Sequence, residues 1–292
     1  MTKRILVIGK TGQLGRSIEK ISLNYKELDF ILVGRNEIDL SSTASIRSFF
    51  KKENAFDVII NAAAYTNVEQ AEKDFEIANA VNHIAVAEIA KQAKLQQTFL
   101  IHVSTDYVFD GKGSSPYVEE DSLRPLNNYG KTKFLGEQAI LASGCAGVIV
   151  RTGWLYSEFG NNFVKTILRL GQQRDEINVV SDQIGSPTYA LDLARVLVLL
   201  AQPDVQRGIE IFHYSNEGVC SWYELAQAVF NMSNMQTQVV PIQSKDYATQ
   251  AVRPYYSVLN KDKIRHQLDI GIPHWRDSLQ RCLYSLGQCL DG

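Results

Sequence analysis

The sequence lacks the features that mark several large classes of protein. Its four cysteines, Cys145, Cys220, Cys282 and Cys289, are too few and too scattered for a disulfide framework. No Cys-x-x-Cys and no Cys/His cluster has the spacing of a metal site. These absences argue against a disulfide-built secreted protein, so we expect a reducing cytoplasmic environment and no metal.

Long apolar runs are missing as well. No stretch approaches the ~20 apolar residues of a membrane span, and residues 5–8 form too short a run for the core of a signal peptide. Neither sign of charge is in large excess, since 30 Lys and Arg face 32 Asp and Glu. We therefore expect no membrane partner and no nucleic-acid partner, because a polyanion attracts a surplus of basic residues.

The 292 residues are 45% hydrophobic, which is enough for a large core. Short β-branched runs occur at residues 4–8, 29–33, 57–61, 99–103 and 147–151. Between them, Ile77, Val81, Ile84 and Ala85 have helical spacing. Strands that are apolar on both faces and alternate with helices indicate a parallel sheet covered on both sides. We predict the α/β class, with a doubly wound parallel sheet of the Rossmann type.

The alternation becomes irregular after Arg151, and residues 209–214 again have the composition of a strand. We therefore predict a Rossmann domain over residues 1–155, to whose sheet the chain returns at about residues 188–215. A smaller, discontinuous substrate domain takes residues 156–187 and 216–292. Ser221 and Glu224 form a capping-box pattern ahead of apolar residues at helical spacing, which predicts a helix there.

The first predicted strand is followed by Gly9-Lys10-Thr11-Gly12-Gln13-Leu14-Gly15. Glycines where a strand turns into a helix let backbone N–H groups approach a pyrophosphate at the helix N-terminus. The spacing is G-x-x-G-x-x-G rather than the standard G-x-G-x-x-G, and a tight, closely packed turn is the competing interpretation. The position after the first strand of an alternating pattern favours a dinucleotide cofactor.

The second predicted strand ends at Gly34-Arg35-Asn36, where a dinucleotide fingerprint expects an acid for the ribose 2′-hydroxyl. An Arg offers a charged fork suited to a 2′-phosphate, which favours NADPH and leaves NADH possible. In the alternative interpretation, Arg35 stacks on the adenine or lies in solvent, and Asp39 is the acid that faces the cofactor.

Tyr129 and Lys133 are four residues apart, so on a helix they share a face. A neighbouring ammonium favours the phenolate of a tyrosine, and reduction of a ketone needs an acid to protonate the oxygen. Ser104 and Thr105 follow the fourth predicted strand, at the edge where open α/β sheets bind ligands. Taken separately, Tyr129 and Lys133 are also explained as a surface pair, and Ser104 and Thr105 as the end of a strand. Their joint occurrence in this order favours a nicotinamide-dependent reductase.

These segments, together with residues 61–66 (NAAAYT) and 103–111 (VSTDYVFDG), resemble the extended short-chain dehydrogenase/reductase superfamily. The resemblance continues nearly to the end of the chain. Its second half resembles nucleotide-sugar reductases of that superfamily at residues 151–156 (RTGWLY), 161–164 (NNFV), 182–188 (DQIGSPT), 216–218 (NEG) and 253–254 (RP).

The resemblance implies a role for each matching position. Thr105 would hydrogen-bond the C4 carbonyl of the sugar, with Ser104 beside it. Tyr129 would donate the proton, and Lys133 would hold the nicotinamide ribose and keep Tyr129 acidic. The residues implied to line the cofactor are Thr11, Gly12, Gln13, Asp39, Leu40, Ala63, Ala64 and Tyr65, and those implied to face the nucleotide sugar are Trp154, Asn162, Phe163 and Arg253. Trp154 as plain core and Arg253 as a surface ion pair remain the alternatives.

The resemblance also implies a reaction, the NAD(P)H-dependent reduction of dTDP-4-dehydro-β-L-rhamnose to dTDP-β-L-rhamnose for cell-surface polysaccharide. Another nucleotide-sugar reductase or epimerase, or a non-catalytic regulatory subunit on the same fold, is the alternative. Some members carry an acidic residue after the last cradle glycine for a magnesium-linked dimer. Arg16 stands there, so we expect no such metal, and the protein is either a monomer or a homodimer.

Overall fold

The computed structural model describes residues 2–53, 55–202 and 208–288. A six-stranded sheet with the order β10-β5-β4-β3-β1-β2 forms its centre, and every pairing in it is parallel. The strands are β1 Lys3–Ile8, β2 Leu28–Val33, β3 Val58–Asn61, β4 Phe99–Thr105, β5 Gly147–Thr152 and β10 Ile209–His213. The predicted doubly wound parallel sheet is confirmed, and its strand order reverses between β1 and β3.

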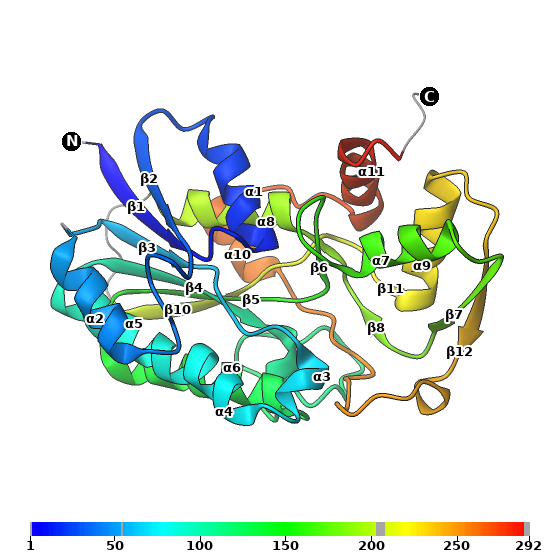
Figure 1. Cartoon of the computed structure of the whole chain (residues 1–292), viewed down its shortest axis with the longest axis horizontal. Helices are drawn as coiled ribbons and strands as arrows, with labels where there is room; N and C mark the ends of the chain where they lie inside the picture. The colour runs from blue at the N-terminus through cyan, green and yellow to red at the C-terminus, as the bar shows by residue number, and fades with distance from the viewer. Residues whose placement is uncertain (1, 54, 203–207, 289–292) are drawn as a thin grey trace.

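Helices cover both faces of this sheet (Figure 1). One face carries α1 Gln13–Ser22 and α8 Ala190–Leu200, and the other carries α2 Thr43–Lys52, α5 Ala85–Leu95 and α6 Asn128–Ser143. Ile5 and Val7 pack in the hydrophobic cluster of α1 and α8, whereas Leu6 and Ile8 pack in the cluster of α2 and α5. Alternate residues of one strand thus serve two cores, which explains why the runs are apolar throughout.

Two local expectations need correction. Ser104 and Thr105 lie inside β4, because the pairing with β5 continues through Arg151 and Thr152. The segment with helical spacing is helical, as α4 Phe75–Asn79, the π-helix η1 Ala80–Ile84 and the start of α5. Ile77 and Ile84 are nevertheless exposed, because a π turn adds a residue and rotates the helix face.

The second region lies beside the carboxyl ends of the strands (Figure 1). Its elements are β6 Leu155–Tyr156, α7 Phe163–Gly171, β7 Glu176–Val180, β8 Ile184–Gly185, β9 Thr188–Tyr189, β11 Cys220–Ser221, α9 Trp222–Met232, β12 Gln238–Ile242, α10 Asp262–Leu268 and α11 Trp275–Ser285. Three two-stranded pairs link segments far apart in the sequence, β6 with β9, β7 with β12 and β8 with β11. The capping box of Ser221 and Glu224 is present at the start of α9. The division into two domains at the expected boundaries stays a prediction.

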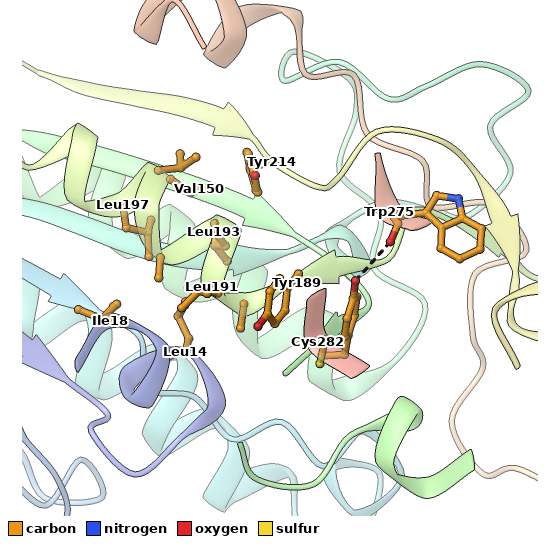
Figure 2. Close-up of a cluster of buried hydrophobic side chains, with 14 of the residues drawn as sticks. Leu14, Ile18, Val150, Tyr189, Leu191, Leu193, Leu197, Tyr214, Trp275 and Cys282 are labelled. Atoms are coloured by element: carbon orange, nitrogen blue, oxygen red, sulfur yellow. Dashed lines mark hydrogen bonds between the residues drawn. The ribbon is translucent and has the colours of Figure 1, made fainter. Parts of the chain in front are cut away.

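A continuous hydrophobic cluster joins the sheet to this second region (Figure 2). Leu14 and Ile18 of α1 lie beside Leu193 and Leu197 of α8. The same cluster continues through Tyr189 to α11. Close by, the Tyr156 hydroxyl donates to the backbone oxygen of Trp275 at 3.5 Å. Because the two regions share one core, the strand ends and the second region are held at fixed positions around the site.

Candidate active site

The glycine-rich turn after β1 is too tight for side chains. A Cβ on Gly9, whose φ is +107°, would lie 2.9 Å from the backbone nitrogen of Ala63, and a Cβ on Gly15 would collide with the carbonyl oxygen of Gly9. Gly12 is the N-cap residue of α1 and offers no side-chain cap. The helix start therefore keeps N–H groups for an anion, at the point where the strand order reverses. The close packing that the sequence left as an alternative is present in this turn, and the role of the turn as a phosphate cradle stays a prediction.

The side chains of the predicted cradle differ in burial and in hydrogen bonding. Leu14 is buried in the core and Thr11 is exposed. Gln13 accepts hydrogen bonds through Oε1 from Ser157 Oγ at 3.2 Å and from Asn162 Nδ2 at 2.9 Å. Asn162 also caps α7 through Lys165 N at 3.1 Å. Its amide nitrogen is used inside the protein, and the expected place of Asn162 toward the nucleotide stays a prediction.

The corner beside the end of β2 contains charged side chains of both signs. Lys10 Nζ lies 2.6 Å from Glu37 Oε1, and the Gly34 N–H donates to Glu37 Oε2 at 2.8 Å. These contacts, with Lys10 first, lower the pKa of Glu37. The Ser41 hydroxyl and N–H lower the pKa of Asp39, and the exposed Arg35 adds to this. Glu37 was missed by sequence reasoning, which sought the acid at Asp39.

The segment of Ala63, Ala64 and Tyr65 is fixed by Asn82, a second residue that sequence reasoning missed. Asn82 Oδ1 accepts from Tyr65 N at 2.8 Å, and its Nδ2 donates to Tyr65 O at 3.0 Å and to Thr132 Oγ1 at 3.1 Å. This fully buried amide belongs to the π-helix η1. It connects the segment expected to line the cofactor with α6. Leu40, another expected lining residue, is half-buried at the end of the β2 corner.

Tyr129 and Thr105 meet where β4 ends and α6 begins. Asn127 caps α6 by accepting from Gly130 N at 2.8 Å, which fixes the first turn that carries Tyr129. Burial raises the pKa of Tyr129 to about 12, a hydrogen bond with Thr105 lowers it, and the charge of Asp106 raises it further. The two residues form the hydroxyl pair that a carbonyl oxygen needs, one as proton donor and one as hydrogen-bond donor.

The Lys133 side chain is buried, although its expected role is to hold the nicotinamide ribose. Its Nζ donates to Val103 O at 2.7 Å and lies 3.2 Å from Nε2 of the buried His102. Burial lowers the pKa of Lys133 to about 8, against the opposing charge of Glu137. Lys133 is not among the groups that shift the pKa of Tyr129. Its expected effect on Tyr129 stays a prediction.

Ser104 points away from Thr105, because neighbouring side chains on a strand leave opposite faces. Its hydroxyl donates to Glu137, which forms a fully buried ion pair with Arg151 at 2.8 Å. Arg151 also donates to the backbone oxygen of Glu119 at 3.2 Å. Ser104 is thus part of a buried polar network beneath the site, and Thr105 alone of the pair reaches Tyr129.

The aromatic residues expected at the sugar gather on the second region. Trp154 has a φ of +51°, and its ring stacks on Trp222 with centroids 3.5 Å apart. Phe163 packs on the same Trp222 at 4.6 Å. A non-glycine residue with positive φ is strained, and such strain is concentrated at functional sites. Trp154 also packs against the hydrophobic core, so the alternative of plain core and the expected place at the sugar both stay open.

Arg253 forms an ion pair with Glu69 at 2.9 Å beside a cavity of about 480 Å³. Its Nε is buried and has no hydrogen-bond partner among the described residues. Asn127, the cap of α6, donates to Val252 O at 2.8 Å and so ties this loop to the first turn of Tyr129. The surface ion pair expected as the alternative exists, and it lies against a cavity close to the candidate site.

Arg16 stands where some family members carry the acidic residue of a metal site. Its guanidinium lies over the ring of Phe159, 4.5 Å from the ring centroid. Within the described residues, no three His, Cys, Asp or Glu side chains gather as metal ligands would. No helix in that same part of the chain has the length and apolar content to cross a bilayer.

Comparison with known proteins gives consistent matches. The family model described as RmlD substrate binding domain matches residues 3–287. The spore coat polysaccharide biosynthesis protein SpsK of Bacillus subtilis strain 168 is 38% identical, covering 100% of both chains. The dTDP-4-dehydrorhamnose reductase of Aggregatibacter actinomycetemcomitans is 40% identical and covers 95% of this chain and 97% of its own. A solved dTDP-4-dehydrorhamnose reductase from Bacillus anthracis strain Ames, in complex with NADP, has a TM-score of 0.92 at 36% identity, covering 98% of this chain and 100% of that chain.

Proposed function

The chain belongs to the family of the RmlD substrate binding domain, and we propose that it reduces the C4 keto group of dTDP-4-dehydro-β-L-rhamnose with NADPH. The single observation that carries this proposal is that Thr105 and Tyr129 lie together at the carboxyl edge of the sheet, both in contact with Tyr107. Its N–H donates to Thr105 Oγ1 at 3.2 Å, and its ring packs on Tyr129 with centroids 5.6 Å apart. That edge also holds the glycine turn and the start of α1. Relatives named for this reaction match nearly the whole chain.

The cofactor fits the residues that are present. The first turn of α1 offers backbone N–H groups, and the glycines Gly9, Gly12 and Gly15 keep side chains out of the way. Lys10 and Arg35 bring positive charge to the β2 corner, where the adenosine ribose would lie. We assign the 2′-phosphate of NADPH to Arg35 and the nicotinamide end to Ala63, Ala64 and Tyr65, the segment that Asn82 fixes. NADH stays possible, because Glu37 offers an acceptor for a free ribose hydroxyl.

The chemistry divides between cofactor and protein. When bound, NADPH supplies a hydride to the carbonyl carbon. Tyr129 donates its phenol proton to the oxygen, and Thr105 donates a hydrogen bond to the same oxygen. Lys133 lies one helical turn from Tyr129 and would reach the nicotinamide ribose by leaving the backbone oxygen of Val103. The site therefore contributes orientation, a proton and a hydrogen-bond donor.

The substrate is assigned to the side of the second region. Trp154, backed by Trp222, would pack on the deoxysugar, with Phe163 nearby. Arg253 would meet the diphosphate, because its guanidinium has an unpartnered Nε beside a cavity. The product, an activated deoxysugar, is a building block for cell-surface polysaccharide. The three described cysteines are free thiols, which supports an enzyme that works in the reducing cytoplasm. A monomer or a homodimer stays our proposal for its assembly.

The experiment mixes the protein with NADPH and dTDP-4-dehydro-β-L-rhamnose and follows the absorbance of reduced nicotinamide. Loss of absorbance with formation of dTDP-β-L-rhamnose supports the proposal, and Tyr129→Phe is the matched control that keeps the ring but loses the proton. Turnover only with a different sugar nucleotide would indicate a related reductase. Binding without turnover of any sugar nucleotide would indicate a regulatory subunit on this fold.

A further inference from the structure

Asp106 lies directly behind the Thr105–Tyr129 pair and has no role in the mechanism so far. It begins the 3-10 turn η2, Asp106–Val108, and only 2% of its surface is exposed. Thr105 Oγ1 donates to Asp106 Oδ1 at 2.9 Å. The second carboxyl oxygen, Oδ2, is buried and has no hydrogen-bond partner among the described residues. A buried carboxylate oxygen without a donor is costly, which favours a protonated carboxyl.

The surroundings of Asp106 hold it in place and supply no cation to it. A Cβ on Gly153 would lie 2.5 Å from Oδ2, so only glycine fits between the carboxyl and the adjacent Trp154. Tyr107 on its own turn and Tyr129 from α6 face Asp106, and Arg253 and Glu69 of α3, Val68–Ala71, act on Tyr107 rather than on Asp106. Burial raises the pKa of Asp106 to about 6, although the hydroxyls of Ser257 and Thr105 lower it.

The hydroxyl of Thr105 carries one proton and has two acceptors within reach. It donates to Asp106 Oδ1 in the structure, and its hydrogen bond with Tyr129 lowers the pKa of that phenol, as donation to the phenolate would. It also accepts from Tyr107 N at 3.2 Å, so its orientation is restricted. A hydroxyl that gives its proton to a carboxylate has none left for a substrate carbonyl.

We infer that Asp106 is a positioning residue that decides where Thr105 donates its proton. A protonated Asp106 donates to Thr105 and leaves the Thr105 proton for the substrate carbonyl, whereas an ionised Asp106 takes that proton. The inference rests on the proposed function, because it concerns the carbonyl that Thr105 and Tyr129 serve.

The test compares the pH profile of kcat for the wild type, Asp106→Asn and Thr105→Ser, from about pH 5 to about pH 9 at saturating substrates. We expect wild-type kcat to fall as the pH rises through the pKa of Asp106. Thr105→Ser keeps a hydroxyl and therefore keeps this fall. Asp106→Asn cannot ionise, so its kcat is expected to show no such fall, while its kcat at low pH stays within about tenfold of wild type. NADPH binding and thermal unfolding of Asp106→Asn report whether the variant is folded.

Two outcomes would overturn the inference. One is a wild-type profile that stays flat across this range, whether or not the variant folds. The other is a folded Asp106→Asn protein whose kcat falls with pH as the wild type does. Absence of NADPH oxidation by the wild type with any sugar nucleotide would contradict the proposed function instead, so the two failures are distinguishable.

Discussion

The two ends of the candidate site differ in how they hold their charges. At the chemical end, Lys133, Glu137 and Arg151 are all at most 1% exposed, and each has a hydrogen-bonded partner. At the β2 corner, the Lys10 and Glu37 side chains are 36% and 38% exposed. Removing one partner of a buried pair leaves an uncompensated charge in a low dielectric, whereas water replaces the partner of an exposed one. We therefore propose that the buried end fixes the chemistry and that the exposed corner adjusts which cofactor is used.

The largest effect is expected at the buried end. Tyr129→Phe removes the proton donor but keeps the ring that packs 5.6 Å from Tyr107. We expect kcat to fall by roughly 10²–10⁴-fold, the usual contribution of a general acid. NADPH affinity, measured by fluorescence titration, should stay close to wild type. A variant with more than half of the wild-type turnover would remove Tyr129 from the mechanism.

The buried ion pair is the next most sensitive feature. Glu137→Gln leaves the guanidinium of Arg151 without its carboxylate in a site that is 1% exposed. We expect the free energy of unfolding to drop by about 3–5 kcal/mol, measured by denaturant titration. Lys10→Gln is the matched control at the exposed corner and should leave the unfolding curve nearly unchanged. Equal losses for both variants would contradict the contrast between the two ends.

Asp106 gives the buried end a dependence on pH. Its pKa is raised to about 6 from the ordinary value of 3.8, so the folded state binds a proton more tightly than the unfolded chain. This stabilisation is complete at low pH and is lost as the pH rises through the folded-state pKa. Relative to Asp106→Asn, the wild type should lose roughly 1–2 kcal/mol between about pH 5 and pH 8. A constant difference in unfolding free energy across that range would mean that Asp106 has an ordinary pKa.

At the exposed corner, Arg35→Ala should weaken NADPH binding by about tenfold and leave NADH binding almost unchanged, because a charge-assisted contact to a phosphate is lost. Dissociation constants from fluorescence titration check this. Equal losses for both cofactors would place Arg35 on the adenine instead. No loss for either would place it in solvent and remove the reason to prefer NADPH.

The smallest effect is expected for Glu37→Gln. This change removes the negative charge that holds Lys10 at 2.6 Å, so Lys10 becomes free to meet a 2′-phosphate. We expect NADPH to bind more tightly, by no more than about fivefold, because exposed ion pairs are weak. Asp39→Asn is the matched control, since Asp39 hydrogen-bonds Ser41 rather than Lys10. Weaker NADPH binding in Glu37→Gln would show that Glu37 supports the cofactor instead of competing with it.

The sequence predicts the central sheet well because each strand is apolar on both faces, which few other elements are. It does not predict the short pairs β6–β9, β7–β12 and β8–β11, because they depend on contacts between distant segments. The same holds for the site. Thr105, Tyr129 and Lys133 stand in a recognisable order, whereas Asn82, His102 and Asp106 act only through tertiary hydrogen bonds. The alternation of side chains along β4 did contain a usable signal, since it separates Ser104 from Thr105.

The central claim is that Thr105 and Tyr129 hold a sugar C4 carbonyl while hydride arrives from NADPH. The most direct test supplies NADPH that carries deuterium at both hydrogen positions of nicotinamide C4 together with dTDP-4-dehydro-β-L-rhamnose, and locates deuterium in the product by NMR. The account predicts one deuterium on C4 of dTDP-β-L-rhamnose in the wild type, and almost no product with Tyr129→Phe. A product without deuterium, or with deuterium at another carbon, would contradict it.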